Sequence, residues 1–166
     1  MSSFLSRLRR HKLLLAFLPA LIFLFCSVFY YEINHSFVAF CDTVFRNEIT
    51  ENTLNLHYTL ENPEILNLSD PDVSFGSMNP EVLADSFSQQ NIYLEKLFKF
   101  PKDWLSTKNR LTYDILTSAF SLQAEGEKYL LYDEPLGPSL GTQAQLPVLL
   151  AEYSFHNKKD IETYLA

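Results

Sequence analysis

This 166-residue sequence is poor in cysteine and glycine, with two cysteines and four glycines, and its histidines are not clustered. Cys26 lies inside an apolar run and Cys41 lies beyond it, so we expect no disulfide between them. The sequence contains no His-Glu-x-x-His motif, no Gly-rich phosphate loop and no Gly-x-Ser-x-Gly turn. The histidines, no two of them within five residues, are His11, His35, His57 and His156. We therefore assign no catalytic, cofactor-binding or metal-binding residue in this chain.

Acidic residues are absent from the first 31 positions, and all twenty Asp and Glu lie from Glu32 onward. Beyond position 31 these twenty acids outnumber nine basic residues, which gives a net charge of −11 against −7 for the whole chain. A surface this acidic repels phosphate backbones, so we expect no nucleic-acid partner. The basic residues near the start are Arg7, Arg9, Arg10 and Lys12.

A long apolar run occupies residues 13–31, with no charged residue in nineteen positions. As a helix that rises ~1.5 Å per residue it would span roughly 28 Å, close to the hydrocarbon thickness of a bilayer. Pro19 is compatible with a helix in lipid, and Tyr30 and Tyr31 suit the aqueous interface. The sequence therefore predicts a transmembrane anchor in contact with the lipid bilayer.

Three other interpretations of this run are weaker. A cleaved signal peptide needs small residues before its cleavage site, and no Ala-x-Ala-like site follows the run. A lipid-modified Cys26 would follow a small residue, but Phe25 precedes it. A buried core helix of this length seldom lacks charges entirely. Because positive flanks stay cytoplasmic, we expect a single-pass protein of the cell membrane with residues 1–12 in the cytoplasm and residues 32–166 outside.

The residues beyond the anchor predict a mostly α-helical fold with long Pro/Gly-rich loops. Residues 35–49 form an amphipathic pattern, and residues 53–60, which alternate like a strand, are interpreted as helix because no pairing strand is evident. Residues 61–80 are a loop that ends in the capping residue Asn79, with Met78 placed to pack on Leu83. The helix that follows is expected to bury Leu83, Phe87, Leu94, Leu97 and Phe98.

Three further helices are predicted towards the end of the chain. One runs from about residue 107 to 124, with an apolar face of Leu111, Ile115, Ala119 and Leu122 that is widened by Tyr113, Leu116 and Phe120. The next covers about residues 146–153, with Pro147 near its first turn. The last is capped by Asn157 and has run about two turns at Ala166, so we expect residues 32–166 to be an incomplete domain.

The loop at residues 132–145 is the candidate cleft or partner loop, because irregular Gly/Pro-rich segments often carry binding residues. Asp133 and Glu134 would suit a cation or a basic partner, but a solvated turn or a helix cap is the favoured interpretation. Gln143 and Gln145 could contact an extended peptide substrate, although bonding to the neighbouring loop is favoured. His57 is interpreted as a hydrogen-bonded structural histidine in preference to a ligand. The candidate residues are Tyr132, Asp133, Glu134, Gly141, Gln143 and Gln145.

Three stretches resemble one bacterial family, namely FRNEITENTLNLHYTLENPE (45–64), NRLTYDILTSAF (109–120) and YLLYDEPLGPSLGTQAQLPVLLAEYSF (129–155). The family is catalogued as domain of unknown function 885, and its members look like zinc metallopeptidases with membrane or lipid anchors. The resemblance implies a longer parent protein whose zinc site lies downstream, in a His-Glu helix followed by Gly-His-His. This chain would then pack against the remainder of the family domain and be inactive alone. The alternative function is a non-enzymatic extracytoplasmic interaction module.

Overall fold

A computed structural model describes residues 2–61, 63–66, 68, 73–75, 77, 79–132, 136–139 and 141–166, with side chains described from residue 18 onward except at positions 64, 130 and 131. The described residues contain helices and turns but no strand, which confirms the mostly α prediction. The helices are α1 (Ser2–Ile49), α2 (Thr53–Thr59), α3 (Pro80–Leu97), α4 (Thr107–Gly126), α5 (Thr142–Ala151) and α6 (Lys158–Leu165). Short 3-10 turns are η1 (Pro63–Leu66), η2 (Lys102–Trp104) and η3 (Glu127–Tyr132).

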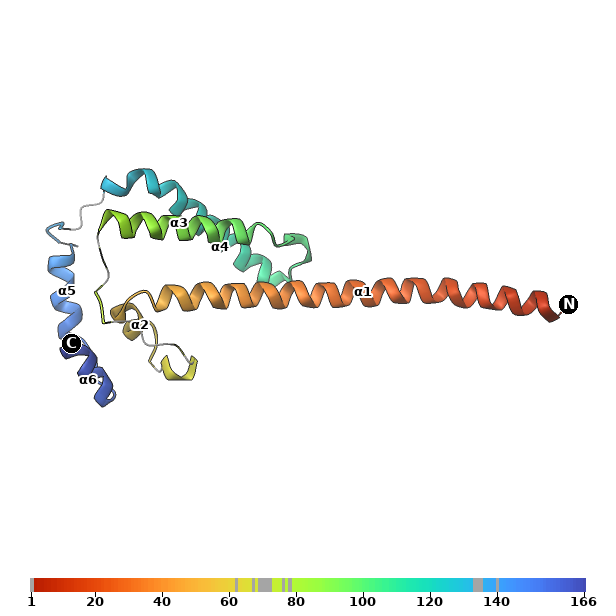
Figure 1. The fold of residues 1–166 in the computed structure, drawn as a ribbon, viewed down its shortest axis with the longest axis horizontal. Coiled ribbons are helices and arrows are strands. Elements are labelled where there is room, and N and C mark those ends of the chain that lie inside the picture. The colour runs from red at the N-terminus through yellow and green to blue at the C-terminus, as the bar shows by residue number, and fades with distance from the viewer. Residues whose placement is uncertain are drawn as a thin grey trace.

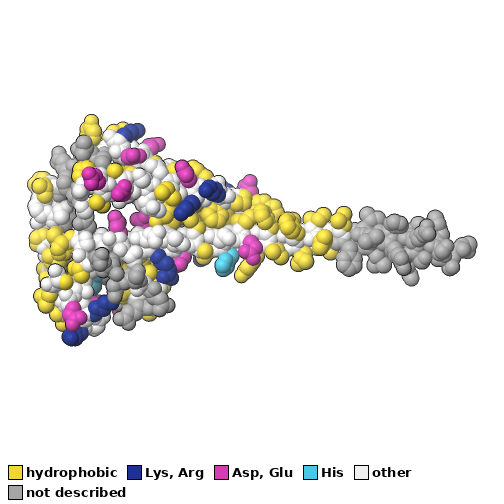
Figure 2. All heavy atoms as spheres, viewed as in Figure 1, with side chains coloured by type: hydrophobic (Ala, Val, Ile, Leu, Met, Phe, Trp, Pro, Cys, Tyr) yellow, Lys and Arg dark blue, Asp and Glu magenta, His cyan; other side chains and the backbone are white. Residues whose placement is uncertain are grey.

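Helix α1 is a single helix of 48 residues that projects far beyond the rest of the molecule (Figure 1). The apolar run and the amphipathic pattern at 35–49, which the sequence suggested as two separate segments, are one unbroken helix. Pro19 lies inside it without ending it. By length and composition, the described part of α1 is long and apolar enough to cross a membrane. The part of α1 up to Tyr31 is the stalk. Its large apolar side chains are exposed from Leu18 to Tyr31, and Figure 2 shows this surface in yellow.

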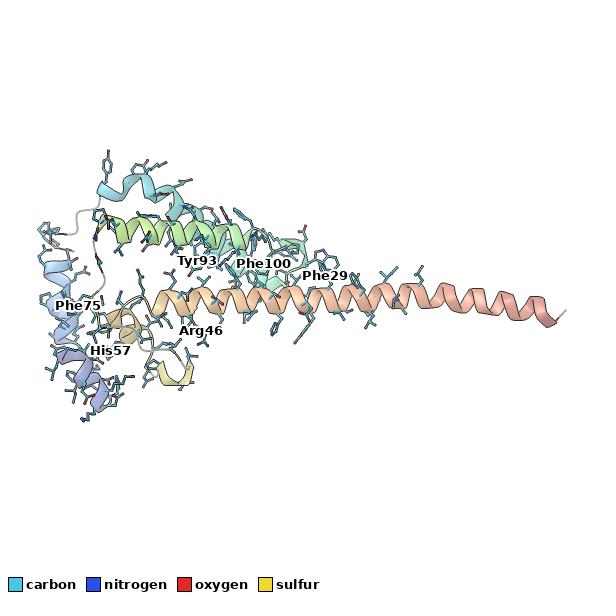
Figure 3. All side chains as sticks on the ribbon, viewed as in Figure 1. Phe29, Arg46, His57, Phe75, Tyr93 and Phe100 are labelled. Carbon is cyan, nitrogen blue, oxygen red and sulfur yellow. The ribbon has the colours of Figure 1, made fainter. Side chains whose placement is uncertain are left out.

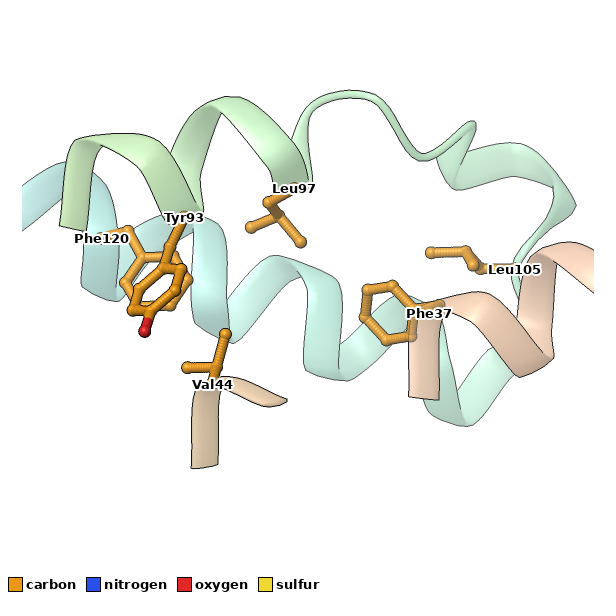
Figure 4. Close-up of a cluster of buried hydrophobic side chains, with 6 residues drawn as sticks. All are labelled: Phe37, Val44, Tyr93, Leu97, Leu105 and Phe120. Atoms are coloured by element: carbon orange, nitrogen blue, oxygen red, sulfur yellow. The ribbon is translucent and has the colours of Figure 1, made fainter. Parts of the chain in front are cut away.

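The described residues from Glu32 onward form the head of the molecule. Its core lies where the second half of α1 meets α3 and α4, which run beside each other (Figures 1 and 4). Phe37 contacts Phe100 edge-on, with 5.3 Å between ring centroids, and Phe40 contacts Tyr93 at 6.5 Å. Half-buried Cys41 packs against the same cluster, and this burial raises the pKa of its thiol. The buried members of this proximal core are Phe37, Val44, Tyr93, Leu97, Leu105 and Phe120.

The predicted apolar face of α4 is wrong in part. Leu111, Ile115 and Leu122 are 63%, 59% and 72% exposed, whereas Phe120 is buried and Tyr113 and Leu116 pack against the core. The neighbouring stripe therefore faces α1 and α3. Phe98, directly after α3, is exposed against expectation, and Leu97 and Tyr93 on α3 are buried.

Polar side chains cap the starts of α2, α3, α4 and α6. The Asn79 side chain accepts a hydrogen bond from the Glu81 N–H, and Asn157 forms a reciprocal capping box with Asp160, so both predicted caps are confirmed. The segment at 53–59 is helical as interpreted, with Asn52 as its cap. Helix α5 begins at Thr142, earlier than predicted, with Pro147 inside it. The contact of Met78 with Leu83 lies outside the described residues.

Candidate functional site

The predicted loop at 132–145 is described only in part. Asp133 and Glu134 lie outside the described residues, and Tyr132 ends η3 with its side chain exposed. Gln143 and Gln145 lie on α5, not in an irregular loop, because the helix starts before them. The candidate side chains therefore come from different elements, and no contact between them forms a shared site in the described part.

Gly141 and Gln143 hold the start of α5 against the preceding turn. The Gly141 N–H donates to the Gly137 carbonyl oxygen at 3.0 Å, and a Cβ at position 141 would overlap the Gly137 backbone. The Gln143 Nε2 donates to the carbonyl oxygens of Leu136 and Gly137 at 3.1 and 2.7 Å. The favoured interpretation, that Gln143 bonds its neighbouring loop, is confirmed. Both residues act locally on the turn.

A cluster that the sequence did not reveal lies at the end of the head farthest from the N-terminus, where α2 meets α6 (Figures 1 and 3). The His57 ring stacks on Tyr153 with centroids 3.7 Å apart, and the His156 ring lies 6.2 Å from it. The Tyr58 hydroxyl donates to the Leu149 carbonyl oxygen, which ties α2 to α5. His57, Tyr58, Tyr153 and His156 form the distal cluster. The contact that holds His57 is ring stacking and not the expected hydrogen bond, and the choice between a structural histidine and a ligand stays a prediction.

The distal cluster borders a hollow of about 400 Å³ between α2, η1 and α6. Its walls are apolar at Leu56 and Leu60 and polar at Glu61, Asn157 and Thr163. His57, Tyr153 and His156 also line it. A hollow of this size and mixed polarity can hold a small polar molecule.

The Asp160 carboxylate, which also lines the hollow, already accepts hydrogen bonds from the backbone. Its Oδ2 accepts hydrogen bonds from the His156 and Asn157 N–H groups at 2.7 and 3.0 Å. The His156 Nδ1 lies 3.8 Å from the same oxygen. This carboxylate therefore serves the helix cap and is poorly placed to act as a general base on a ligand.

The pKa values of three groups in the distal cluster are shifted by their surroundings. Burial lowers the pKa of His57, the Asp160 carboxylate opposes this shift, and the His156 ring adds to it. Burial also raises the pKa of Tyr58 and of Tyr153; Glu152 and Tyr164 add to the shift at Tyr58, and Asp160 and Tyr58 add to it at Tyr153. His57 is therefore favoured as a neutral ring at neutral pH.

Zinc, which the family resemblance implies for the parent protein, has no fitting set of ligands here. Among the described residues, no group of three His, Cys, Asp or Glu side chains could hold a metal ion. The His57 and His156 rings lie 6.2 Å apart, and the Asp160 carboxylate beside them already accepts hydrogen bonds from two backbone N–H groups. No catalytic step through a metal is derived for these residues.

A second, more open hollow of about 700 Å³ separates the end of α1 from the first half of α3. It is lined by Glu48 from α1, by Glu51 from the turn after α1, and by Leu83 and Phe87 from α3. The Gln90 Nε2 donates to Glu48 Oε1 at 2.9 Å, while the Gln90 Oε1 is buried without a partner. The two helices thus diverge here and leave half-buried apolar side chains beside polar ones.

No family model, curated protein or solved structure gives a significant match to this chain. The resemblance to the bacterial family stays a prediction that depends on the three quoted stretches.

Proposed function

We propose that this chain anchors a larger, zinc-peptidase-like helical protein to the cell membrane and forms one wall of it. The observation that carries this proposal is the continuity of α1. The same helix exposes large apolar side chains up to Tyr31 and buries Phe37 and Val44 in the head. A head built on its own membrane helix is held at a fixed height above the bilayer, because no flexible linker separates the two parts.

The orientation follows from the charge at the start of the chain. Residues 1–12 carry four basic residues and no acid, which favours a cytoplasmic N-terminus and an extracytoplasmic head. The anchor is then single-pass, and the bilayer contacts the chain through residues 13–31.

The uncovered apolar surfaces of the head support the wall role. Leu111, Ile115 and Leu122 form an exposed stripe along α4, and the open hollow beside α3 adds half-buried apolar side chains. An exposed apolar stripe on a helix supports a contact with more protein. In this proposal the remainder of the family domain covers it, and a peptide substrate and the zinc ion bind in that remainder.

The alternative function is that of a non-enzymatic interaction module on the extracytoplasmic face of the membrane. The 400 Å³ hollow beside His57 favours it, because its mixed walls can hold a small polar ligand without any catalytic group. In that case the chain would fold and act without additional protein.

Membrane anchoring is tested by fractionation and thiol labelling in a bacterial host. In a background with Cys26→Ser and Cys41→Ser, an impermeant reagent should label Lys128→Cys in intact spheroplasts and Ser3→Cys only after lysis. The double variant Leu21→Lys and Phe25→Lys should leave the membrane fraction, because charges at mid-bilayer are costly. Val38→Lys, an exposed site outside the apolar run, is the matched control. Labelling of Ser3→Cys before lysis would overturn the orientation.

The family part of the proposal is tested on the coding frame past codon 166. An open frame that leads to a His-Glu helix and a Gly-His-His motif, together with zinc in the purified long protein, is the expected result. A stop codon with no such motif downstream would leave the interaction module.

A further inference from the structure

The connection between α3 and α4 reaches back along α1 to the level of the apolar run. The Trp104 ring meets the Phe29 ring edge-on, with 5.1 Å between centroids, and Phe29 is labelled on α1 beside this connection in Figure 3. Phe29 precedes the end of the run at Tyr31 by two residues, or roughly 3 Å along a helix. If residues 13–31 span the bilayer, Trp104 therefore lies at the depth of the lipid headgroups.

Asn34 fixes the connection at this height. Its Oδ1 accepts hydrogen bonds from the Ser106 N–H at 2.7 Å and from the Asn109 Nδ2 at 2.8 Å. Its Nδ2 donates to the Trp104 carbonyl oxygen at 3.0 Å. One α1 side chain thus holds both the end of η2 and the first turn of α4, so the connection cannot lift away from α1 without breaking three hydrogen bonds.

Residues 96–110, which include the α3–α4 connection, have a net charge opposite in sign to that of the rest of the head. Residues 96–110 carry five basic residues and a single acid, Asp103, a net charge of +4. The other residues from 32 onward carry four basic and nineteen acidic residues, a net charge of −15. All five basic side chains are exposed, and they are Lys96, Lys99, Lys102, Lys108 and Arg110.

Aromatic side chains accompany these charges. Phe98 and Trp104 are 57% and 38% exposed although both are large and apolar. Figure 2 shows dark-blue basic side chains on this end of the head, next to yellow surface that continues onto the stalk. Lys102 pairs with Asp114 at 2.6 Å, so the other four basic residues supply most of the uncompensated charge. Aromatic rings beside basic residues are typical of contacts with the bilayer interface, and the basic residues attract anionic lipids.

We infer that residues 96–110 form a second membrane contact, in which Phe98 and Trp104 enter the interface and the basic side chains bind anionic phospholipid headgroups. This inference rests on the proposed membrane span of α1. Its consequence is a head that is held against the bilayer at two places, by its core helix and by the α3–α4 connection, and is thereby oriented as well as tethered.

Trp104 is the only tryptophan in the chain, so its fluorescence reports this contact alone. The full chain is reconstituted in bilayers of neutral phosphatidylcholine, or of an equal mixture with anionic phosphatidylglycerol. Nitroxides attached to the headgroups should quench Trp104, and the bilayer should shield it from acrylamide. Both effects should be larger in the anionic mixture. The double variant Lys99→Glu and Lys108→Glu should lose this difference, and Lys158→Glu with Lys159→Glu, the same charge change at the distal end, should keep it.

A second reporter separates this inference from the anchor. In a variant with Trp104→Phe and Phe23→Trp, a nitroxide deep in the acyl chains should quench the indole at position 23. If that indole is quenched and Trp104 is not quenched by headgroup nitroxides, the connection stands clear of lipid and the inference fails while the anchor remains. If anionic lipid makes no difference to Trp104, headgroup binding by the basic residues is overturned. If the indole at position 23 stays unquenched, the anchor fails and the inference fails with it.

Discussion

The two ends of the head are held together in different ways. At the membrane-proximal end, six buried side chains from α1, α3, α4 and the α3–α4 connection form one continuous core around Phe37 and Leu97. At the distal end, α2, α5 and α6 are joined mainly by ring contacts, tyrosine hydroxyls and helix caps, and the described part buries little beyond Leu56 and Tyr153. The proximal end is held by buried apolar side chains, and the distal end is held mainly by ring contacts and hydrogen bonds. The distal end should therefore open first.

The largest expected effect is in the proximal core. Phe37→Ala removes a ring that is 1% exposed and in contact with Phe100, which should lower the free energy of unfolding of the head by about 3–5 kcal/mol. Leu111→Ala, at an exposed site on α4, should cost less than about 0.5 kcal/mol. Denaturant unfolding in detergent micelles, followed by near-ultraviolet circular dichroism, measures both. Equal losses would show that the buried cluster is not the core of the head.

A smaller effect is expected at the link between α1 and α4. Asn34→Ala leaves the part-buried Ser106 N–H and Asn109 amide without their acceptor, which should cost about 1–3 kcal/mol. His35→Ala, one residue along on the exposed side of α1, is the matched control. The Trp104 emission should also shift to the red in the Asn34 variant only. An unchanged emission spectrum would mean that Asn34 does not position the connection.

The distal caps should give a local effect of about 1 kcal/mol. Asn157→Ala removes the capping box of α6, and hydrogen exchange should accelerate at the α6 amides but not at those of α1. Lys158→Ala, an exposed neighbour that loses only a surface ion pair with Glu162, is the control. If the proximal core exchanged faster as well, the two ends would form one cooperative unit and the comparison drawn above would be wrong.

The smallest predicted effect is a pH dependence confined to the distal end. Burial lowers the folded-state pKa of His57 below the usual 6.5, so the packing against Tyr153 favours the neutral ring. Its stabilising contribution is complete above pH 6.5 and is lost as the pH falls below that value. Nuclear magnetic resonance titration of the His57 ring measures its pKa, and α6 exchange at pH 5 and 7.5 measures the consequence. A His57 pKa above 6.5 would contradict this prediction, and His57→Gln should remove the pH dependence while His35→Gln keeps it.

Local signals predicted the α1 side of the proximal core and the starts of two helices. The apolar period at residues 35–49 indicated the α1 side of the core, and Asn79 and Asn157 marked helix starts because capping needs only a few neighbouring residues. The period could not choose between the two apolar faces of α4. The stripe of Leu111, Ile115 and Leu122 and the stripe of Tyr113, Leu116 and Phe120 both have helical spacing, and only contact with α1 and α3 decides which one is buried.

The distal cluster could not be predicted because its members are far apart in the sequence. His57 and Tyr153 are separated by 96 positions, and neither belongs to a motif whose spacing announces a contact. The predicted end of the candidate loop at residue 145 is wrong, and its role as a cleft or partner loop stays a prediction. Gly and Pro near residues 135–141 indicated irregular backbone, but the α5 start at Thr142 turned Gln143 inward to the carbonyl oxygens of the preceding turn.

The central claim is that one unbroken helix passes from the membrane into the core of the head. Spin labels at Ser27→Cys and Thr43→Cys, in a chain with Cys26→Ser and Cys41→Ser reconstituted in bilayers, measure this directly by double electron–electron resonance. Sixteen residues of continuous α-helix predict a narrow distance distribution centred about 24 Å between the labelled backbone positions. A broad distribution or a markedly shorter distance would show a hinge between the anchor and the head, and would contradict the account.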